Sequence, residues 1–206
     1  MKNTATDFDV LIVGAGISGI GMAAHMKDKA PGHSFAIVER RDKQKRMKEL
    51  GGVFSDNKHG HFLAIMITKL EDLCDGSFNG KIIAMLGVTF KPDTDDMRDA
   101  PALTIVPALV GGGAQVSVVD PQGRREGEAL LPGVRWEDDP YAAAEGADLL
   151  LILTEWNEFR ALDLGRIASS MATARLADLR NIYSASDAEA AGFVAYDSIG
   201  RTGYGR

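Results

Sequence analysis

The connecting loop from Gly87 to Pro101 gathers more chemically useful side chains than any other stretch of the chain. It reads GVTFKPDTDDMRDAP and carries one lysine, one arginine and four aspartates between an apolar strand and an apolar helix. In an open α/β sheet, a loop at the carboxyl end of a strand lies where such sheets bind anionic ligands. Lys91, close to the start of the following helix near Pro101, could bind a phosphate; the alternative is a solvated surface charge. The loop therefore predicts a nucleotide site.

The acidic residues of this loop could in principle hold a metal ion. We expect Asp95, Asp96 and Asp99 instead to pair with Arg98 and to cap backbone N–H groups. The other candidate, His59-Gly60-His61, lacks a cysteine pair or further nearby imidazoles, so we interpret these histidines as surface residues. No metal site is predicted.

A second motif near the amino terminus has the spacing of a dinucleotide fingerprint. Its glycines are Gly14, Gly16 and Gly19. They would permit a tight turn, a close approach of backbone N–H groups to a pyrophosphate, and packing of the helix on the strand. Glu39, at the end of the next strand, could bind a ribose hydroxyl, which favours FAD or NAD, although the adjacent Arg40 and Arg41 could accept a 2′-phosphate. The alternative is a tight turn without a ligand.

Strand and helix patterns alternate along the chain, which predicts an α/β fold with a Rossmann-like doubly wound parallel sheet and an additional amino-terminal βαβ unit. The expected domains are a dinucleotide-binding unit (7–41), a connector with a helix (42–79) and a larger domain (80–206). Strands are expected at 8–13, 34–38, 81–86, 115–119, 149–154, 175–178 and 193–196. Helices are expected at 17–26, 62–73, 102–110, 141–145, 164–171 and 185–191.

Composition narrows the possible classes of protein. With 206 residues, 45% of them hydrophobic and a net charge of −6, the chain can bury one sizeable core and gives no reason to expect nucleic acid. No apolar run is long enough to span a membrane, and the solitary Cys74 cannot form an internal disulfide, so we expect a cytoplasmic protein. Because an orphan βαβ unit rarely stands alone, we expect this unit either to dock on the larger sheet or to be buried in a homo-oligomer, a dimer.

The segment from Asp7 to Arg41, DFDVLIVGAGISGIGMAAHMKDKAPGHSFAIVERR, resembles the start of flavin-dependent monooxygenases of the Baeyer–Villiger type. The resemblance implies that Gly14, Gly16, Gly19 and Glu39 would contact FAD. Nothing after Arg41 resembles the rest of such an enzyme.

The segment from about residue 80 to residue 201 resembles the carboxyl-terminal UDP-binding domain of the UDP-glucose dehydrogenase family. The matching stretches are GVTFKP, TDDMRDAP, VDP, TEW, DLRN and SIGR. The resemblance implies that Phe90 and Lys91 contact a UDP-sugar, that Arg98 reaches an NAD cofactor held mainly by another domain, and that Arg201 lies near the nucleotide-sugar.

Members of that family oxidise UDP-glucose to UDP-glucuronate through a covalent adduct on a cysteine. Here the only cysteine, Cys74, is flanked by acids and is expected to be structural, so no catalytic residue is assigned. Two hypotheses follow. The chain is an oxidoreductase-family protein that binds a UDP-sugar and turns over only if a partner supplies the cysteine. Alternatively, it is a non-catalytic binding or oligomerisation module of composite or truncated origin, natural or engineered.

Overall fold

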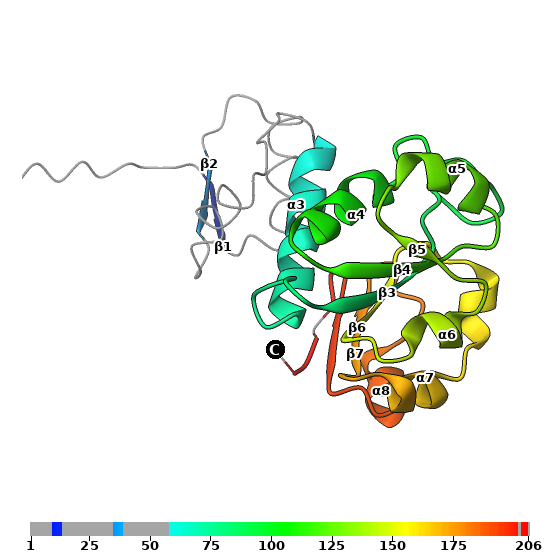
Figure 1. Ribbon diagram of the computed structural model, residues 1–206. Coiled ribbons are helices and arrows are strands. Elements are labelled where there is room, and N and C mark those ends of the chain that lie inside the picture. The colour runs from blue at the N-terminus through cyan, green and yellow to red at the C-terminus, as the bar shows by residue number, and fades with distance from the viewer. Residues whose placement is uncertain (1–9, 14–34, 39–57, 202, 206) are drawn as a thin grey trace, which may run out of the picture. The chain divides into compact units, whose positions relative to one another are not determined.

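The computed structural model describes residues 10–13, 35–38, 58–201 and 203–205 of the chain (Figure 1). The chain divides into two compact units, Met1–Ile65 and Met66–Arg206. In the described part, no helix is both long and apolar enough to cross a lipid bilayer.

The first unit contains a pair of parallel strands. These are β1 (Val10–Val13) and β2 (Phe35–Val38), with Val10 opposite Phe35. This pairing confirms the two strands expected for the amino-terminal unit. The predicted helix at 17–26 and the candidate residues Gly14, Gly16, Gly19 and Glu39 lie outside the described residues.

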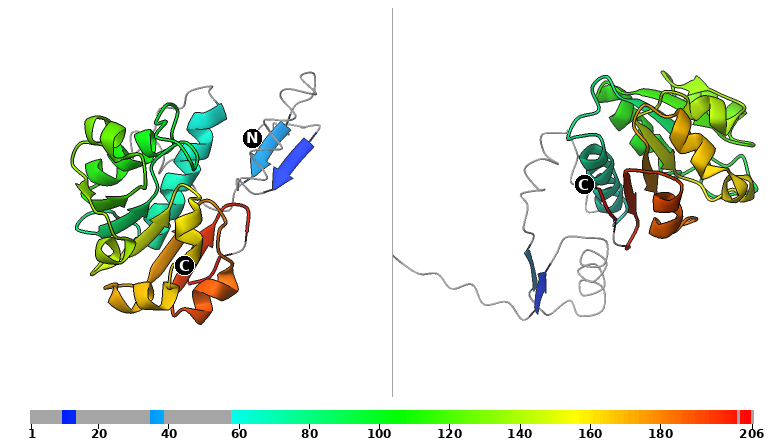
Figure 2. Two further views of the ribbon diagram at one scale, coloured as in Figure 1. Left: turned by 90° about the vertical axis from the view of Figure 1, so that its right-hand side faces the viewer. Right: turned by 90° about the horizontal axis from the view of Figure 1, so that it is seen from below.

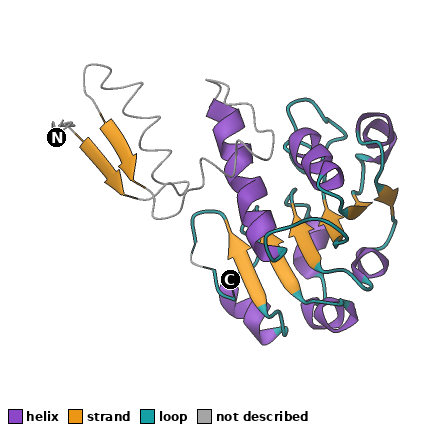
Figure 3. Cartoon of the chain, turned by 60° about the vertical axis from the view of Figure 1, so that its left-hand side comes forward, coloured by secondary structure: helices purple, strands orange, loops and turns teal. Residues whose placement is uncertain are grey.

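The second unit is built on a parallel sheet. Its strands are β3 (Ile82–Leu86), β4 (Gln115–Val119), β5 (Arg135–Trp136), β6 (Leu149–Ile152), β7 (Arg175–Asp178) and β8 (Ala195–Ser198). They lie in the order β5-β4-β3-β6-β7-β8, and every neighbouring pair is parallel. Figure 3 draws the strands as orange arrows. The first strand of this unit, β3, thus lies in the middle of the sheet. Strands β4 and β5 extend the sheet on one side of β3, and β6, β7 and β8 extend it on the other. The predicted Rossmann-like α/β fold is confirmed.

Helices cover both faces of this sheet (Figures 1 and 2). They are α3 (Lys58–Leu73), α4 (Ala102–Gly111), α5 (Arg124–Leu130), α6 (Pro140–Ala144), the 3-10 helix η1 (Asn157–Ala161), α7 (Leu164–Ser170) and α8 (Ala185–Ala190). Buried residues of α6, α7 and α8 form one continuous apolar cluster with Ala84 and Leu86 of β3. Because side chains alternate along a strand, Ile83 and Met85 serve the opposite face, which accounts for the complete burial of all four.

Helices α6, α7 and α8 begin at side chains that cap their first backbone N–H groups. The carboxylates of Asp139 and Asp163 accept hydrogen bonds from backbone N–H groups in the first turns of α6 and α7. Ser184 and Asp187 form a reciprocal capping box at α8. Each cap satisfies donors that have no partner within the helix, so these short helices start where the sequence places an acid or a serine.

Two expectations about the elements were wrong. The last strand covers Ala195–Ser198 rather than 193–196, because the strand continues through Asp197, which is buried and paired with a lysine. Helix α5, strand β5 and the 3-10 helix η1 were not expected at all. Their sequences, RREGEAL, RW and NEFRA, are short and carry no apolar period.

The outer edge of β8 is occupied by other parts of the same unit. Tyr196 and Tyr204 exchange backbone hydrogen bonds of 3.1 and 3.0 Å in an isolated antiparallel bridge, and their rings stack with centroids 6.1 Å apart. At Ser198, the N–H donates to Asp197 Oδ1 and the carbonyl accepts from Lys69 Nζ on α3. Tyr196 and Ser198 thus have their backbone groups satisfied.

Candidate functional site

The strand order reverses between β3 and β6, and the loops at their carboxyl ends form the candidate site. In doubly wound sheets, this reversal separates two outgoing loops and leaves a crevice in which ligands bind. The loop after β3 begins at Gly87, and the loop after β6 begins at Leu153.

Gly87 sets the direction of the loop after β3. Its φ of 85° lies in a region that side chains disfavour, and a Cβ there would collide with the side chain of Thr154 and lie 2.8 Å from the Thr154 backbone nitrogen. Thr154 Oγ1 in turn donates a 2.7 Å hydrogen bond to the Thr89 carbonyl. The two loops are therefore in direct contact at their first residues.

Asp120, directly after β4, holds the same loop from the other side. Its Oδ2 accepts hydrogen bonds from the Val88 N–H at 2.7 Å, the Thr89 N–H at 3.2 Å and the Trp156 indole N–H at 3.3 Å. Its Oδ1 accepts from the N–H groups of Gln122 and Gly123. One carboxylate thus joins the loops that follow β3, β4 and β6.

Phe90 and Lys91 project from this anchored loop. Phe90 is 46% exposed, which is unusual for a large apolar side chain in this unit, and its N–H bonds to the Asp96 carbonyl at 2.9 Å. Lys91 is exposed, and its ammonium forms no hydrogen bond or ion pair with another described residue. The loop therefore presents an aromatic ring and a positive charge beside the reversal of the strand order.

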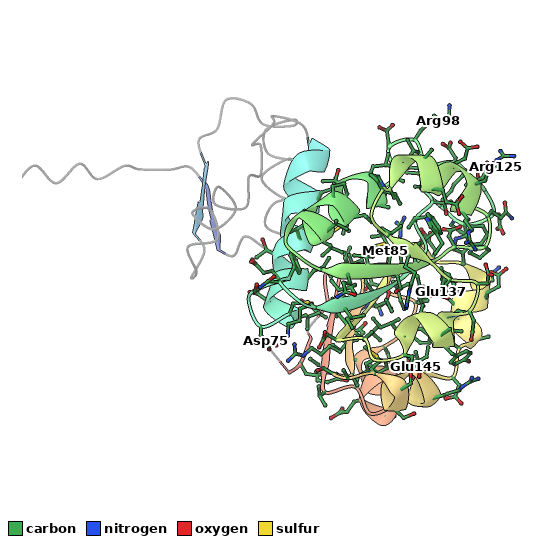
Figure 4. All side chains as sticks on the ribbon, viewed as in Figure 1. Asp75, Met85, Arg98, Arg125, Glu137 and Glu145 are labelled. Atoms are coloured by element: carbon green, nitrogen blue, oxygen red, sulfur yellow. The ribbon has the colours of Figure 1, made fainter. Side chains whose placement is uncertain are left out.

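Arg98 lies on the same loop but is held by a carboxylate. Its guanidinium donates to both oxygens of Asp96 at 2.9 and 2.8 Å, and this contact lowers the pKa of Asp96 to about 2. The expected pairing of Asp96 with Arg98 is confirmed, whereas Asp95 pairs with Arg125 on α5 at 3.4 Å. Figure 4 shows Arg98 and Arg125 extending outward from the unit.

The acidic residues do not converge. Among the described residues, no group of three or more histidine, cysteine, aspartate or glutamate side chains could hold a metal ion. Asp93 and Asp99 instead adopt positive φ angles of 61° and 57°, a turn conformation that aspartate tolerates better than most residues. The acids of this loop therefore shape its turns and neutralise its arginine.

Arg180, in the loop after β7, has contacts that the sequence did not reveal. Its Nε donates to the Leu153 carbonyl at 2.7 Å and lies 2.9 Å from Glu155 Oε2, while an Nη donates to the Phe90 carbonyl at 3.0 Å. The residue lies within the matching stretch DLRN, but sequence alone did not show where its guanidinium would reach. Arg180 thereby joins the first part of the loop that carries Phe90 to the loops after β6 and β7.

Arg201 follows β8 and lies at the same edge of the sheet, though not beside Lys91. Strands β6 and β7 lie between β8 and β3, which corresponds to roughly 14 Å of strand spacing. The exposed Arg201 donates to the Tyr183 carbonyl at 3.4 Å. The structure thus brings Phe90, Lys91 and Arg98 together on one loop and leaves Arg201 on another.

Cys74 and Trp156 have structural positions. Cys74 is fully buried after α3, and burial raises the pKa of its thiol to about 11, which suppresses the reactive thiolate. This confirms the expectation of a structural cysteine, although burial, rather than the neighbouring acids, is the main cause. Trp156 is also buried, and its indole N–H donates a hydrogen bond to Asp120.

Residues 84–185 match the family described as "UDP-glucose/GDP-mannose dehydrogenase family, UDP binding domain". This segment is a UDP-glucose dehydrogenase-like UDP-binding domain. The match contains β4 to β7 and most of β3, with the loops that carry Phe90, Lys91, Asp120 and Arg180. It confirms the resemblance of the larger unit to that domain.

The chain is also similar to two UDP-glucose 6-dehydrogenases. The chain is 44% identical over 174 residues to a UDP-glucose 6-dehydrogenase of Rhizobium meliloti, covering 83% of this chain and 39% of that protein. It is 38% identical over 143 residues to a UDP-glucose 6-dehydrogenase of Pseudomonas aeruginosa, covering 66% and 31%. The chain therefore spans well under half the length of these relatives.

A solved structure shares the fold of this UDP-binding domain. NDP-N-acetyl-D-galactosaminuronic acid dehydrogenase from Methanosarcina mazei Go1 superposes with a TM-score of 0.57 at 23% identity, over 77% of this chain and 36% of that one. At this identity the likeness concerns the fold alone.

Proposed function

We propose that the Met66–Arg206 unit binds a UDP-sugar at the carboxyl ends of β3 and β6. Lys91 supplies the charge for the diphosphate, the Phe90 ring packs against the nucleotide-sugar, and Arg201 adds a second cation further along the sheet edge. The observation that supports this most directly is the exposed ammonium of Lys91 on a loop anchored within a matched UDP-binding domain. This ammonium forms no hydrogen bond or ion pair with another described residue. A diphosphate needs such a cation, and a fixed loop lowers the entropic cost of binding.

We further propose that the oxidation of the bound UDP-sugar depends on NAD and that Arg98 faces this cofactor. The relatives are named UDP-glucose 6-dehydrogenases. The resemblance to that family implies that oxidation of UDP-glucose to UDP-glucuronate transfers hydrides to NAD. Within this proposal the chain binds the substrate but does not complete the oxidation by itself, because its only thiol, Cys74, is buried and held protonated. Incubation with UDP-glucose and NAD should yield no NADH, and robust turnover would contradict this part.

The amino-terminal segment supports a second candidate function. The parallel pairing of β1 and β2 is the arrangement of a βαβ unit, and the glycine motif lies between these two strands in the sequence. In this proposal Gly14, Gly16, Gly19 and Glu39 hold FAD. A flavin absorption spectrum in the purified protein would support it, and a colourless protein that does not bind added FAD would contradict it.

The primary test is the stabilisation of the protein by UDP. At about 100 times the dissociation constant, UDP should stabilise the folded state by about 2.7 kcal/mol, which raises the melting temperature by roughly 5 to 10 °C. Lys91→Ala should abolish most of this shift. Lys81→Ala is the matched control, because Lys81 lies at the opposite end of the same strand and pairs with Asp75. An unchanged melting temperature of the wild-type protein with UDP would contradict the site.

A further inference from the structure

Asp120 lies at a position that usually faces a ligand in dinucleotide-binding sheets. When such a sheet binds NAD or FAD, an acid at the end of the second strand of the βαβ unit points outward to a ribose hydroxyl. In this unit β4 is the second strand, and Asp120 follows it directly. Asp120 is instead only 9% exposed, and both of its carboxylate oxygens accept hydrogen bonds from the chain itself.

The donors to this carboxylate belong to the loops around the candidate site. Val88 and Thr89 lie immediately before Phe90 and Lys91, and Trp156 lies in the loop across the strand reversal. Thr89 and Trp156 are each 1% exposed, so these hydrogen bonds do not compete with water. Buried charge-assisted bonds of this kind hold backbone in place more strongly than neutral ones.

We infer that Asp120 is a positioning residue for UDP binding. It holds the backbone of Val88 and Thr89, and thereby fixes where Phe90 and Lys91 emerge at the end of β3. Since its oxygens are already occupied, it does not serve as a ribose acceptor in this unit. This inference rests on the proposed binding of UDP at that loop.

The opposite end of β3 offers a matched anchor far from the candidate site. Asp148 Oδ2 accepts a 2.9 Å hydrogen bond from the Ile82 N–H at the amino end of the strand. Both aspartates thus hold backbone N–H groups at an end of one strand, but only Asp120 holds the loop that carries Lys91. Removing either carboxylate should destabilise the fold, because backbone N–H groups at one end of β3 lose their acceptor. Only the removal of Asp120 should weaken UDP binding.

The experiment compares Asp120→Ala with Asp148→Ala in the full chain, below the unfolding transition of each variant. UDP affinity is measured by calorimetry, and amide hydrogen exchange is followed at Val88, Thr89 and Ile82. Asp120→Ala should weaken UDP binding by about tenfold or more, because Val88 and Thr89 lose their acceptor. It should also accelerate exchange at those two amides. Asp148→Ala should accelerate exchange at Ile82 and leave UDP affinity within about twofold of wild type.

Asp120→Asn provides the second variant if removal of the whole carboxylate prevents folding. It keeps the size of the side chain and one acceptor oxygen, and should give an intermediate affinity. Equal UDP affinity in the Asp120 and Asp148 variants would overturn the inference. If the wild-type protein does not bind UDP, the proposed function is wrong, and so is the role of Asp120 in UDP binding. Unchanged amide exchange at Val88 and Thr89 in the Asp120 variants would separately show that Asp120 does not hold this loop.

Discussion

Gly87 shows how one backbone angle controls the start of the candidate site. Its positive φ turns the chain out of β3, and the absent Cβ leaves room for Thr154, whose hydroxyl bonds the Thr89 carbonyl. A side chain at this position would both disfavour the positive φ and collide with Thr154. A substitution at this position therefore combines the cost of backbone strain with the cost of lost space.

Gly87→Ala should destabilise the fold by about 3 kcal/mol, because the cost of a positive φ adds to that of overpacking against Thr154. Gly146→Ala is the control. Gly146 has a φ of 69°, but a methyl group there would meet no atom within 4 Å, so only about 1 kcal/mol of strain is expected. Urea unfolding measures both values. Equal losses would show that contact with Thr154 is unimportant.

At the level of single residues, the sequence proposed candidates on the loop after β3 but not the contacts that hold this loop. The loop motif identified Phe90, Lys91 and Arg98, because their types and order are local information. The inward turn of Asp120 and the reach of Arg180 to the Phe90 carbonyl depend on strands that are distant in the sequence. No spacing rule could have shown these contacts.

The end of α3 illustrates how elements are joined across the sheet. Helix α3 has no basic residue in its last turn, and Arg175 on β7 provides the cation by donating to the Leu73 carbonyl at 2.8 Å. The same guanidinium bonds both oxygens of Asp75, which also accepts from Lys81. These contacts lower the pKa of Asp75 from 3.8 to about 2.

This ion pair predicts a pH dependence of stability. Because the pKa of Asp75 is lower in the folded state, its contribution is present above about pH 4 and is lost as the pH falls towards 2. Asp75→Asn keeps a residue that tolerates the positive φ of 60°. It should cost less than about 1 kcal/mol at neutral pH, since the carboxylate is largely exposed. Urea midpoints should converge near pH 2, and a constant difference would contradict the assignment.

Elements with strong apolar patterns were predictable, and polar ones were not. Strands β3, β4, β6 and β7 are apolar runs bounded by turn residues, and each was placed correctly within two residues of its ends. Helix α5 carries only one buried residue, Gly127, which packs against Trp136. Its location is determined by tertiary contact rather than by its own sequence pattern.

At the scale of the molecule, the candidate site belongs to one compact unit. The hydrogen bonds that hold Phe90, Asp120, Arg180 and Arg201 in the described part of the chain join residues of Met66–Arg206. We therefore expect a shortened chain of residues 58–206, which retains all of α3, to fold and to bind UDP with the affinity of the full chain. Calorimetric titration of both proteins tests this. Weaker binding by the shortened chain would show that the first unit contributes contacts.

The Tyr196–Tyr204 bridge has a consequence for how copies of this protein meet in concentrated solution. Exposed strand margins act as templates that recruit foreign strands and lead to fibres. Here a strand from another molecule could pair with β8 only after it displaced Tyr204 from Tyr196 and the Lys69 ammonium from Ser198. The other margin, β5, offers only two residues for such recruitment. Neither edge of this six-stranded sheet therefore offers a long unpaired strand on which a fibre could grow.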